Sequence, residues 1–274
     1  SDIFTRTITD IIARNKLVDQ TIVVNNQTDG GGEVGRLRVS QAKGDGLTLL
    51  TFNSGDLVPM VTNTPNRLSG FRPIAVMAVD RHLLLQGKSP RFESFVDAIA
   101  EAQAGGRVII GGSKGDDINL YNMMLAEFGV TEDELVYVMF DATSDALTAL
   151  LGGHIDYCIG KPAASDQYIK SGDAFPVVAF AMERFGGDLA EVPLLSEIGP
   201  YNDIESPIWR GVVTSQKTPD NIVQYWSDIL QQVSETEEWD KEYIERNLLT
   251  EYFLPWDEAT TYMQTYEDNV LAGL

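Results

Sequence analysis

The residues best suited to chemistry lie where short apolar runs end in glycine, a hydroxyl or a charged side chain. The sequence has three such junctions, namely Gly-Gly-Ser-Lys-Gly-Asp-Asp at 111–117, Phe-Asp-Ala-Thr-Ser at 140–144 and Gly-Lys-Pro-Ala at 160–163. Each precedes a helical pattern, and the free N–H groups and dipole of a helix start attract anions. The junctions therefore predict an anion site, with a plain loop capped by Asp116 as the alternative at 111–117. Lys161 would meet a carboxylate there, unless it is a solvated surface lysine.

A glycine-rich stretch earlier in the chain has the spacing of a nucleotide-binding loop. Gly30, Gly32 and Gly35 fit G-x-G-x-x-G, and Asp56 follows about 20 residues later, where such folds place a ribose-binding acid. The polar run 25–29 separates these glycines from the strand expected at 21–25, whereas the nucleotide motif begins directly after its strand. A glycine turn that lets the backbone approach another element is favoured. A nucleotide-dependent enzyme using residues 30–35 is the alternative.

Other signs of catalysis or metal binding are weak. His82 and His154 lack metal-ligand spacing to a second histidine or cysteine, and Cys158 is the only cysteine, which excludes an internal disulfide. Cys158 stands in the apolar run 155–159 and is expected to be a buried core thiol. No nucleophile elbow or zinc-protease motif occurs. With 41 acidic residues, accidental carboxylate pairs are unavoidable. We therefore assign no catalytic residue, no metal ligand and no cofactor.

Composition narrows the class of protein further. The chain has 274 residues, 43% of them hydrophobic, with a formal charge of −21. That charge disfavours nucleic acid and anionic membrane surfaces, which require a positive footprint. No apolar run approaches the roughly 20 residues that span a bilayer. The chain begins at Ser1-Asp2, already inside a helical pattern, so we expect processing or truncation ahead of it.

Short apolar strands alternate with helical patterns along most of the chain, which favours doubly wound, mostly parallel sheets with helices on both faces. Strands are expected at 21–25, 47–53, 73–79, 82–86, 107–111, 135–140, 155–159, 176–181 and 209–214, with a short one near Tyr252, and helices at 1–17, 33–43, 90–104, 116–128, 144–151, 163–170, 219–233, 235–247 and 257–271. Because a glycine pair at 105–106 precedes a new strand and a helical tail follows 209–214, we predict two lobes. Lobe one is 1–105 plus 207–274, and lobe two is 106–206.

Six motifs occur in the order found in one protein family. They are Ser-Asp-Ile-Phe-Thr-Arg at 1–6, Val-Val-Asn-Asn at 23–26 with Asp-Gly-Gly-Gly-Glu-Val-Gly at 29–35, Asp-Gly-Leu-Thr-Leu at 45–49, Ala-Leu-Thr-Ala-Leu-Leu-Gly-Gly-His-Ile-Asp at 146–156, Val-Pro-Leu-Leu-Ser-Glu-Ile-Gly at 192–199, and Trp-Arg-Gly-Val-Val at 209–213 followed by Thr-Pro at 218–219. Over essentially its whole length the chain resembles the receptor family of the tripartite tricarboxylate transporters, the Bug-type extracytoplasmic solute receptors. The family's first strand is absent ahead of Ser1.

The resemblance implies an α/β fold of the two-lobed periplasmic-binding-protein type (type II-like), with a ligand cleft between the lobes. It implies an exported receptor, not an enzyme, that captures a small organic carboxylate outside the cytoplasm and delivers it to membrane transporter subunits. We expect a monomer without cofactor. A receptor that presents its ligand to a sensor kinase is the second alternative.

The ligand-binding positions that the resemblance implies come from several loops: Ser1, Asp2, Asn53, Ser54, Gly55, Ser113, Lys114, Gly115, Asp141, Ala142, Thr143, Gly160, Lys161 and Arg210. The chain departs from the family pattern at two of these places. Gly160-Lys161 stands where many members have Asp-Asn, and Arg210 where many have an aromatic residue. Lys161 and Arg210 are thus the candidate charged contacts, although Arg210 could equally face away and pair with an acid.

Overall fold

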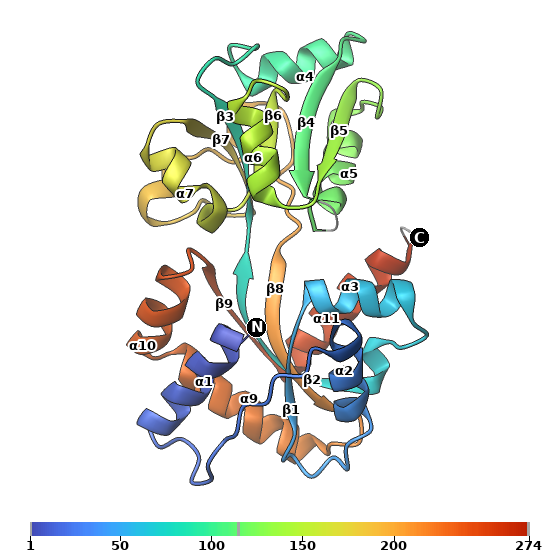
Figure 1. Cartoon of the computed structure of the whole chain (residues 1–274), viewed down its shortest axis with the longest axis vertical. Coiled ribbons are helices and arrows are strands. Elements are labelled where there is room, and N and C mark those ends of the chain that lie inside the picture. Colours follow the sequence, from blue (N-terminus) through green and yellow to red (C-terminus); the bar gives the residue numbers. More distant parts are fainter. Residues whose placement is uncertain (1, 114–115, 273–274) are drawn as a thin grey trace. The chain divides into compact units, whose positions relative to one another are not determined.

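The computed structural model describes residues 2–113 and 116–272, arranged in two α/β units (Figure 1). Unit 1 comprises residues 1–79 and 208–274, and unit 2 comprises residues 80–207. The chain leaves unit 1 at the end of strand β2 (Phe71–Asp80) and returns at the start of β8 (Ile208–Ser215). The predicted α/β fold with two domains is confirmed.

The first crossing lies earlier than the sequence suggested, and this corrects the assignment of residues 80–105 to lobe one. Strand β3 (His82–Gly87) pairs with β6 (Tyr157–Gly160) and β7 (Ala174–Phe180), all within unit 2. Helix α4 (Phe95–Gln103) buries its apolar face in the same core. The glycine pair at 105–106 therefore ends a helix inside unit 2, where Gly105 takes a left-handed φ of 87°.

Unit 1 is built on a four-stranded sheet in the order β1-β8-β2-β9, where β1 is Leu49–Asn53 and β9 is Thr250–Pro255. Strand β1 is antiparallel to β8, and β2 is antiparallel to β9. The remaining elements are helices α1 (Asp2–Arg14), α2 (Glu33–Ser40), α3 (Ser54–Asn63), α9 (Asp220–Ser234), α10 (Glu237–Trp239) and α11 (Trp256–Ala272), the 3-10 turns η1 (Asp29–Gly32) and η2 (Leu68–Gly70), and the π-helical η4 (Asp240–Glu245).

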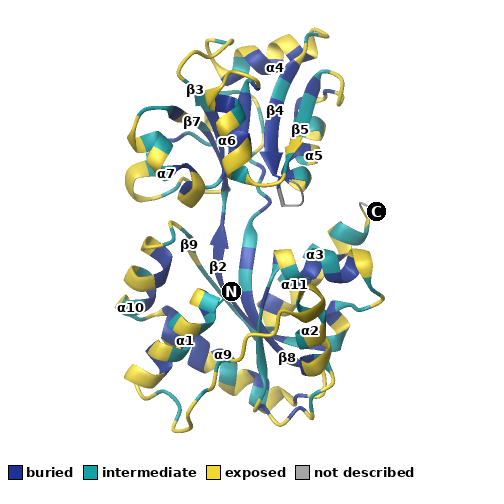
Figure 2. Cartoon of the chain, in the orientation of Figure 1, coloured by how far each residue is buried: buried dark blue, intermediate teal, exposed yellow. Residues whose placement is uncertain are grey.

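Helix α1 shows how the sequence pattern produces packing in unit 1. Its Phe4, Ile8, Ile11 and Ile12 recur at helical spacing and are all buried, while the intervening residues are half-buried or exposed (Figure 2). Phe4 lies against the rings of Trp239 and Tyr243, at centroid distances of 6.0 and 5.4 Å. Burying side chains of this size contributes roughly 1.5–3 kcal/mol each, so this face anchors α1 on unit 1.

Unit 2 is built on a five-stranded sheet in the order β5-β4-β6-β3-β7, where β4 is Val108–Ser113 and β5 is Leu135–Phe140. Strand β4 is parallel to β5 and β6, whereas β3 is antiparallel to β6 and β7. Two of the four pairings in this sheet are therefore parallel as predicted, whereas both pairings of β3, and the β1–β8 and β2–β9 pairings of unit 1, are antiparallel. Its other elements are α5 (Asp116–Phe128), α6 (Thr143–Leu151), α7 (Pro162–Lys170), α8 (Leu195–Ile198) and η3 (Gly187–Leu189).

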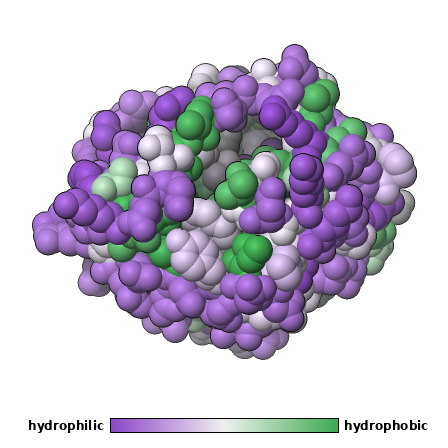
Figure 3. Space-filling view, turned by 90° about the horizontal axis from the view of Figure 1, so that it is seen from below, coloured by the Kyte–Doolittle hydropathy of each residue, from purple (hydrophilic) through white to green (hydrophobic). Residues whose placement is uncertain are grey.

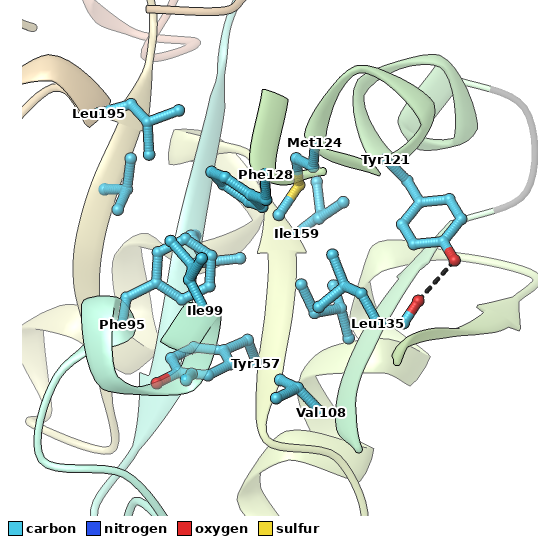
Figure 4. Packing of buried hydrophobic residues seen from close by; sticks show 14 of the residues in the cluster. Phe95, Ile99, Val108, Tyr121, Met124, Phe128, Leu135, Tyr157, Ile159 and Leu195 are labelled. Atoms are coloured by element: carbon cyan, nitrogen blue, oxygen red, sulfur yellow. Dashed lines mark hydrogen bonds between the residues drawn. The ribbon is translucent and has the colours of Figure 1, made fainter. Parts of the chain in front are cut away.

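The core of unit 2 is rich in aromatic residues that meet edge to face (Figure 4). Phe95 of α4 contacts Phe128 and Tyr157 at centroid distances of 5.7 and 5.0 Å. Tyr121 donates a hydrogen bond to the Leu135 carbonyl at 2.6 Å, and burial raises its pKa to about 12. Cys158 is fully buried in β6, and burial raises the pKa of its thiol to about 12.

Three expectations on secondary structure are corrected. Residues 21–25 form no strand, since no neighbouring strand pairs with them and Val23 is 73% exposed. Helix α3, which contains Pro59, was not among the expected helices. The single helix expected at 235–247 is a short α-helix followed by the π-turn η4. β-branched residues alone do not make a strand without a partner edge.

The glycine triplet wraps around one arginine. Gly30, Gly31 and Gly32 have left-handed φ angles of 60°, 65° and 87°, and the Arg36 side chain contacts the last two. Its Nη2 donates to the Gly31 carbonyl at 3.2 Å, and a Cβ on Gly32 would stand 3.1 Å from Nη1. Because no strand precedes these glycines, the frame of a dinucleotide-binding motif is absent from residues 21–35, and the turn interpretation accounts for the motif.

A central glycine of unit 1 provides a test of this packing. A Cβ on Gly211 in β8 would lie 2.6 Å from the Ala75 carbonyl oxygen of β2 and 2.6 Å from Met263 Cε. Gly211→Ala should therefore lower the free energy of unfolding of unit 1 by about 1–3 kcal/mol, measured by urea denaturation. Gly70→Ala, also in unit 1, is the matched control: the nearest atom to its added Cβ would be Ser40 Cβ at 3.5 Å, so it should change the same free energy by less than about 0.5 kcal/mol. Equal midpoints for the two variants would contradict the close approach.

Candidate functional site

The carboxyl ends of three parallel strands meet at one edge of the unit 2 sheet. Strands β4, β5 and β6 end at Ser113, Phe140 and Gly160, and helices α5, α6 and α7 begin within three residues of those ends. Ligands of open α/β sheets bind at such an edge, where helix N-termini face outward. The three junctions singled out from the sequence are therefore brought together by the fold.

A buried carboxylate organises this edge. Asp117, fully buried in the first turn of α5, accepts hydrogen bonds at Oδ2 from the Ser113 amide at 2.6 Å and the Ser113 hydroxyl at 2.7 Å. Its Oδ1 accepts from Lys161 Nζ at 3.1 Å and lies 3.0 Å from His82 Nε2. One side chain thus ties the ends of β4 and β6 to the start of β3.

The surroundings of Asp117 favour its charged form. Burial acts to raise the pKa of this carboxyl, but the hydrogen bond and charge of His82, the Lys161 ammonium and the Ser113 hydroxyl together hold it well below its usual value. His82 is fully buried, and its Nδ1 has no hydrogen-bond partner among the described residues. Tyr137 donates to the Ser113 carbonyl at 2.8 Å, and burial raises the pKa of this phenol, with Asp117 adding to the effect.

Two glycines in this edge are required by packing. A Cβ on Gly112 would meet Tyr137 Oη at 2.4 Å, and one on Gly160 would meet Leu85 Cδ1 at 2.6 Å and Ser165 Oγ at 2.7 Å. Gly160, predicted as a ligand contact, therefore allows β6 to pass close to its neighbours. In the loop before α6, Asp141 and Ala142 are exposed and Thr143 is half-buried, and Ala142 supplies no side-chain cap to the helix.

Unit 1 has its own strand-end cluster. Asn53 ends β1 and caps α3, accepting from the Asp56 amide at 3.0 Å while its own amide donates to Asp56 Oδ2 at 3.2 Å. A Cβ on Gly55 would lie 3.0 Å from Asn53 Oδ1, so Gly55 leaves room for this cap. Ser54 is fully buried, and its hydroxyl has no hydrogen-bond partner among the described residues.

An ion-pair chain stabilises this cap from behind. Arg36 Nε donates to Glu33 Oε2 at 2.9 Å, and Nη1 lies 3.5 Å from Asp56 Oδ1. Burial raises the pKa of Asp56, and Arg36 and the Asn53 amide act in the opposite direction. The arginine held by the glycine triplet therefore helps to keep the carboxylate of the α3 capping box charged.

Arg210 lies opposite Asn53 in the β1–β8 register. Its Nη1 donates to Tyr243 Oη at 2.7 Å, and its guanidinium carbon lies 5.9 Å from the centre of that ring. No carboxylate among the described residues lies within ion-pair distance of Arg210. Among the described residues, Arg210 therefore does not pair with an acid, contrary to the alternative considered from the sequence.

The remaining predicted positions lie apart from these clusters or outside the described residues. Asp2, at the start of α1, is bound by Asn26 at 2.8 Å and Arg6 at 3.0 Å, and the Asn26 hydrogen bond is the main cause of its lowered pKa. Ser1, Lys114 and Gly115 lie outside the described residues. Residues 2–113 and 116–272 contain no group of three or more metal-ligating side chains, and none of their helices is long and apolar enough to cross a membrane.

Comparison with known proteins identifies the family. Residues 5–267 match the model of the tripartite tricarboxylate transporter family receptor, TctC. The chain belongs to this family. A curated relative, the UPF0065 protein in the tcbD-tcbE intergenic region of Pseudomonas sp. (strain P51), is 26% identical over 79% of this chain, and another from Agrobacterium vitis is 23% identical over 82%. The matches span 66% of the length of each of these relatives.

Solved TctC-type structures share the fold. A TctC solute binding protein from Polaromonas, without ligand, superimposes with a TM-score of 0.85 at 20% identity, covering 100% of this chain and 93% of that one. MatC from Rhodopseudomonas palustris with bound malate has a TM-score of 0.64 at 21% identity, covering 97% and 92%. A second R. palustris protein, with adipate, has 0.69 at 20%, covering 99% and 89%. At these identities the likeness establishes the fold.

Sequence reasoning missed three members of the two clusters. The sequence pattern places Asp117 only within a loop motif. However, Asp117 stands four residues after Ser113 at the start of a helix, and at this spacing a carboxylate can accept hydrogen bonds from the end of the preceding strand. His82 was judged only by metal-ligand spacing, which says nothing about a buried hydrogen bond. Tyr243 lies in the π-turn, and no local pattern links it to Arg210.

Removal of the buried charge should destabilise unit 2. Asp117→Asn leaves the Lys161 ammonium, 15% exposed, without its carboxylate, and should lower the free energy of unfolding by about 3–5 kcal/mol in urea. Asp117→Asn combined with Lys161→Met should recover part of the loss, because both charges are gone. Asp133→Asn, at an exposed turn, serves as the control. A single variant as stable as the control would show that Asp117 is not the organising charge.

The same carboxylate predicts a dependence on pH. A carboxyl with a lowered pKa in the folded state adds stability above its unfolded pKa of about 3.9 and loses it as pH falls through the lower folded value. The contribution of Asp117 should therefore be constant from pH 7 to 5 and decline only below about pH 4. The stability difference between wild type and Asp117→Asn, measured by urea denaturation across this range, should follow that course.

Proposed function

We propose that this TctC-family protein is a solute-binding receptor that captures a small organic carboxylate outside the cytoplasm and delivers it to a tripartite-type membrane transporter. The observation that carries the ligand class is the state of Arg210. In a chain with 41 acidic and 20 basic residues, this half-buried guanidinium has no carboxylate partner in the described part of the chain. A planar cation of this kind, already oriented by Tyr243, suits bidentate binding of a ligand carboxylate.

Most other shielded cations of the described residues are paired with a carboxylate. Among described lysines and arginines that are buried or half-buried, Arg36, Arg72, Arg81 and Lys161 each have a carboxylate within 4.0 Å, whereas Arg67 and Arg210 have none. Burial without a partner is costly for a charge, and a ligand anion would offset that cost. The absence of a carboxylate partner at Arg210 among the described residues therefore supports an anionic ligand there.

Lys161 is a weaker candidate for binding the ligand carboxylate than the sequence suggested. The sequence made it the stronger charged contact, but its ammonium is shared with Asp117 at 3.1 Å. A ligand carboxylate at the unit 2 edge would compete with Asp117 for the same ammonium and would otherwise depend on N–H groups at helix starts. Lys161 therefore ranks second to Arg210 as a carboxylate partner.

The relatives support the proposed ligand class. Solved structures of this fold contain malate and adipate, two dicarboxylates, and we extend that class to this chain as the proposal. A receptor role requires no catalytic group, and neither strand-end cluster offers a nucleophile paired with a free base. We further propose an exported, monomeric protein that requires no cofactor. These residues would act by binding, not by catalysis.

Affinity measurements on arginine variants test the proposal. A thermal-shift screen of mono-, di- and tricarboxylates, beginning with malate and adipate, should reveal a ligand that at 100 times its dissociation constant adds about 2.7 kcal/mol of stability. By calorimetry, Arg210→Gln should weaken that ligand by about tenfold or more, because a charge-assisted pair contributes roughly 1.5–3 kcal/mol. Lys161→Ala should weaken it less.

Arg38→Gln is the matched control, since Arg38 is an exposed arginine without an ion pair in the described part of the chain. Its affinity should stay within about twofold of wild type at both 50 and 300 mM salt, as expected for a surface charge. Equal affinities for the Arg210 variant and this control would overturn the assignment of Arg210.

A nucleotide-dependent activity makes the opposite prediction. Because residues 21–25 form no strand and Arg36 lies against the glycine triplet, no cradle for a pyrophosphate is formed by residues 30–35. NAD and ATP should show no saturable binding below millimolar concentration by calorimetry. Micromolar binding of either nucleotide would favour the enzyme alternative.

A further inference from the structure

Unit 1 contains a cavity that shares Arg36 with the ion-pair chain behind its strand-end cluster. It has a volume of about 230 Å³ and lies against helices α2 and α3, the turn η2 and the first residue of β2. The lining residues that matter here are Arg36, Arg67, Asn66, Met60 and Phe71. Because this volume is below the roughly 300–1,000 Å³ of sites for drug-sized ligands, only a small molecule fits.

One charge in this cavity lacks a carboxylate partner. Arg67 Nη1 donates to the Thr64 and Asn66 carbonyls at 3.0 and 2.6 Å, and Nε and Nη2 have no hydrogen-bond partner in the described part of the chain. The two carbonyls fix the plane of the guanidinium without neutralising it. Arg67 and Arg210 are the two shielded cations of this kind among the described residues, and Arg67 is not among the predicted ligand positions.

The other charged groups around the cavity are already paired. Glu33 accepts from Arg36 at 2.9 Å and from the Asn66 side chain, and Arg36 also lies 3.5 Å from Asp56. Glu267, which does not line the cavity, accepts from the Leu68 amide at 2.6 Å. Arg36 is thus shared by two carboxylates, and Arg67 is the cation of the lining that has no carboxylate partner in the described part of the chain.

The other lining residues determine which chemical groups the ligand can carry besides its anionic head. The lining is mainly polar, and Leu37, Pro65 and Phe71 add a smaller apolar part, with the fully buried Met60 behind it. A ligand with one anionic head and a short apolar body would pair with Arg67 and cover this apolar part.

We propose that this cavity is a second binding site, for a small monocarboxylate with a compact apolar body, held by the Arg67 guanidinium. The site is distinct from Arg210 and from the unit 2 edge. It does not depend on the proposed receptor function, because its ligand, charge and walls all lie within unit 1.

The test uses 4-fluorobenzoate as probe, with binding followed by fluorine NMR in a titration of the full chain. Wild type should show saturable binding. Arg67→Gln should weaken it by about tenfold or more, because the charge-assisted pair is lost. Ser69→Tyr, which fills the cavity and leaves Arg67 in place, should weaken it similarly. The uncharged 4-fluorobenzamide should bind about tenfold more weakly than the acid.

Two controls keep this result separate from the proposed receptor function. Arg38→Gln and Arg210→Gln should both bind 4-fluorobenzoate within about twofold of wild type, since neither arginine lines the cavity. Each variant is first checked by circular dichroism and thermal unfolding. Loss of the probe in Arg210→Gln with retention in Arg67→Gln and Ser69→Tyr, or no saturable binding by wild type, would overturn the second site. Neither result would affect the affinity expected for the solute at Arg210.

Discussion

The carboxylate of Asp117 carries its charge where no solvent reaches, and the local structure of unit 2 is arranged to make that possible. Two donors come from the end of β4, one from the lysine that follows β6, and His82 approaches from the start of β3. Because a buried carboxylate without donors would cost several kcal/mol, these elements hold their relative positions as long as the charge is present. The geometry of the strand-end edge therefore depends on a residue that need not touch the ligand.

Unit 1 shows the same dependence in a milder form. Asn53 presents the start of α3, Asp56 completes its capping box, and Arg36 supports Asp56 from within the glycine triplet. The glycines are needed because residues 30–32 adopt left-handed angles around a side chain, which non-glycine residues rarely do. Glycines with the spacing of a nucleotide-binding motif therefore serve here to position Arg36, which stabilises the cap of α3.

The sequence was sufficient for much of this structure where the signal is local. The helix at 116–128 and the strand at 135–140 were predicted to the residue, since apolar periodicity and a glycine stop mark them clearly. The strand expected at 21–25 failed because strand formation depends on a partner that local pattern does not reveal. The unit boundary failed for a related reason, because the antiparallel pairing of β3 with β6 joins residues more than 70 positions apart. Likewise, the sequence identifies Lys161 as a candidate cation, but its pairing with Asp117 depends on the tertiary structure, which local sequence does not reveal.

Cys158 has a consequence for the chemistry of the folded chain. Its thiol is fully buried in β6, and its pKa is raised to about 12, so almost no thiolate is present at neutral pH. Thiolate is the species that attacks disulfides and alkylating reagents, so the native protein is inert to cross-linking and exchange even under oxidising conditions. Reaction requires that β6 leave its sheet. The single thiol therefore reports on opening of unit 2, because its rate of modification measures how often that unit, and not unit 1, exposes its interior.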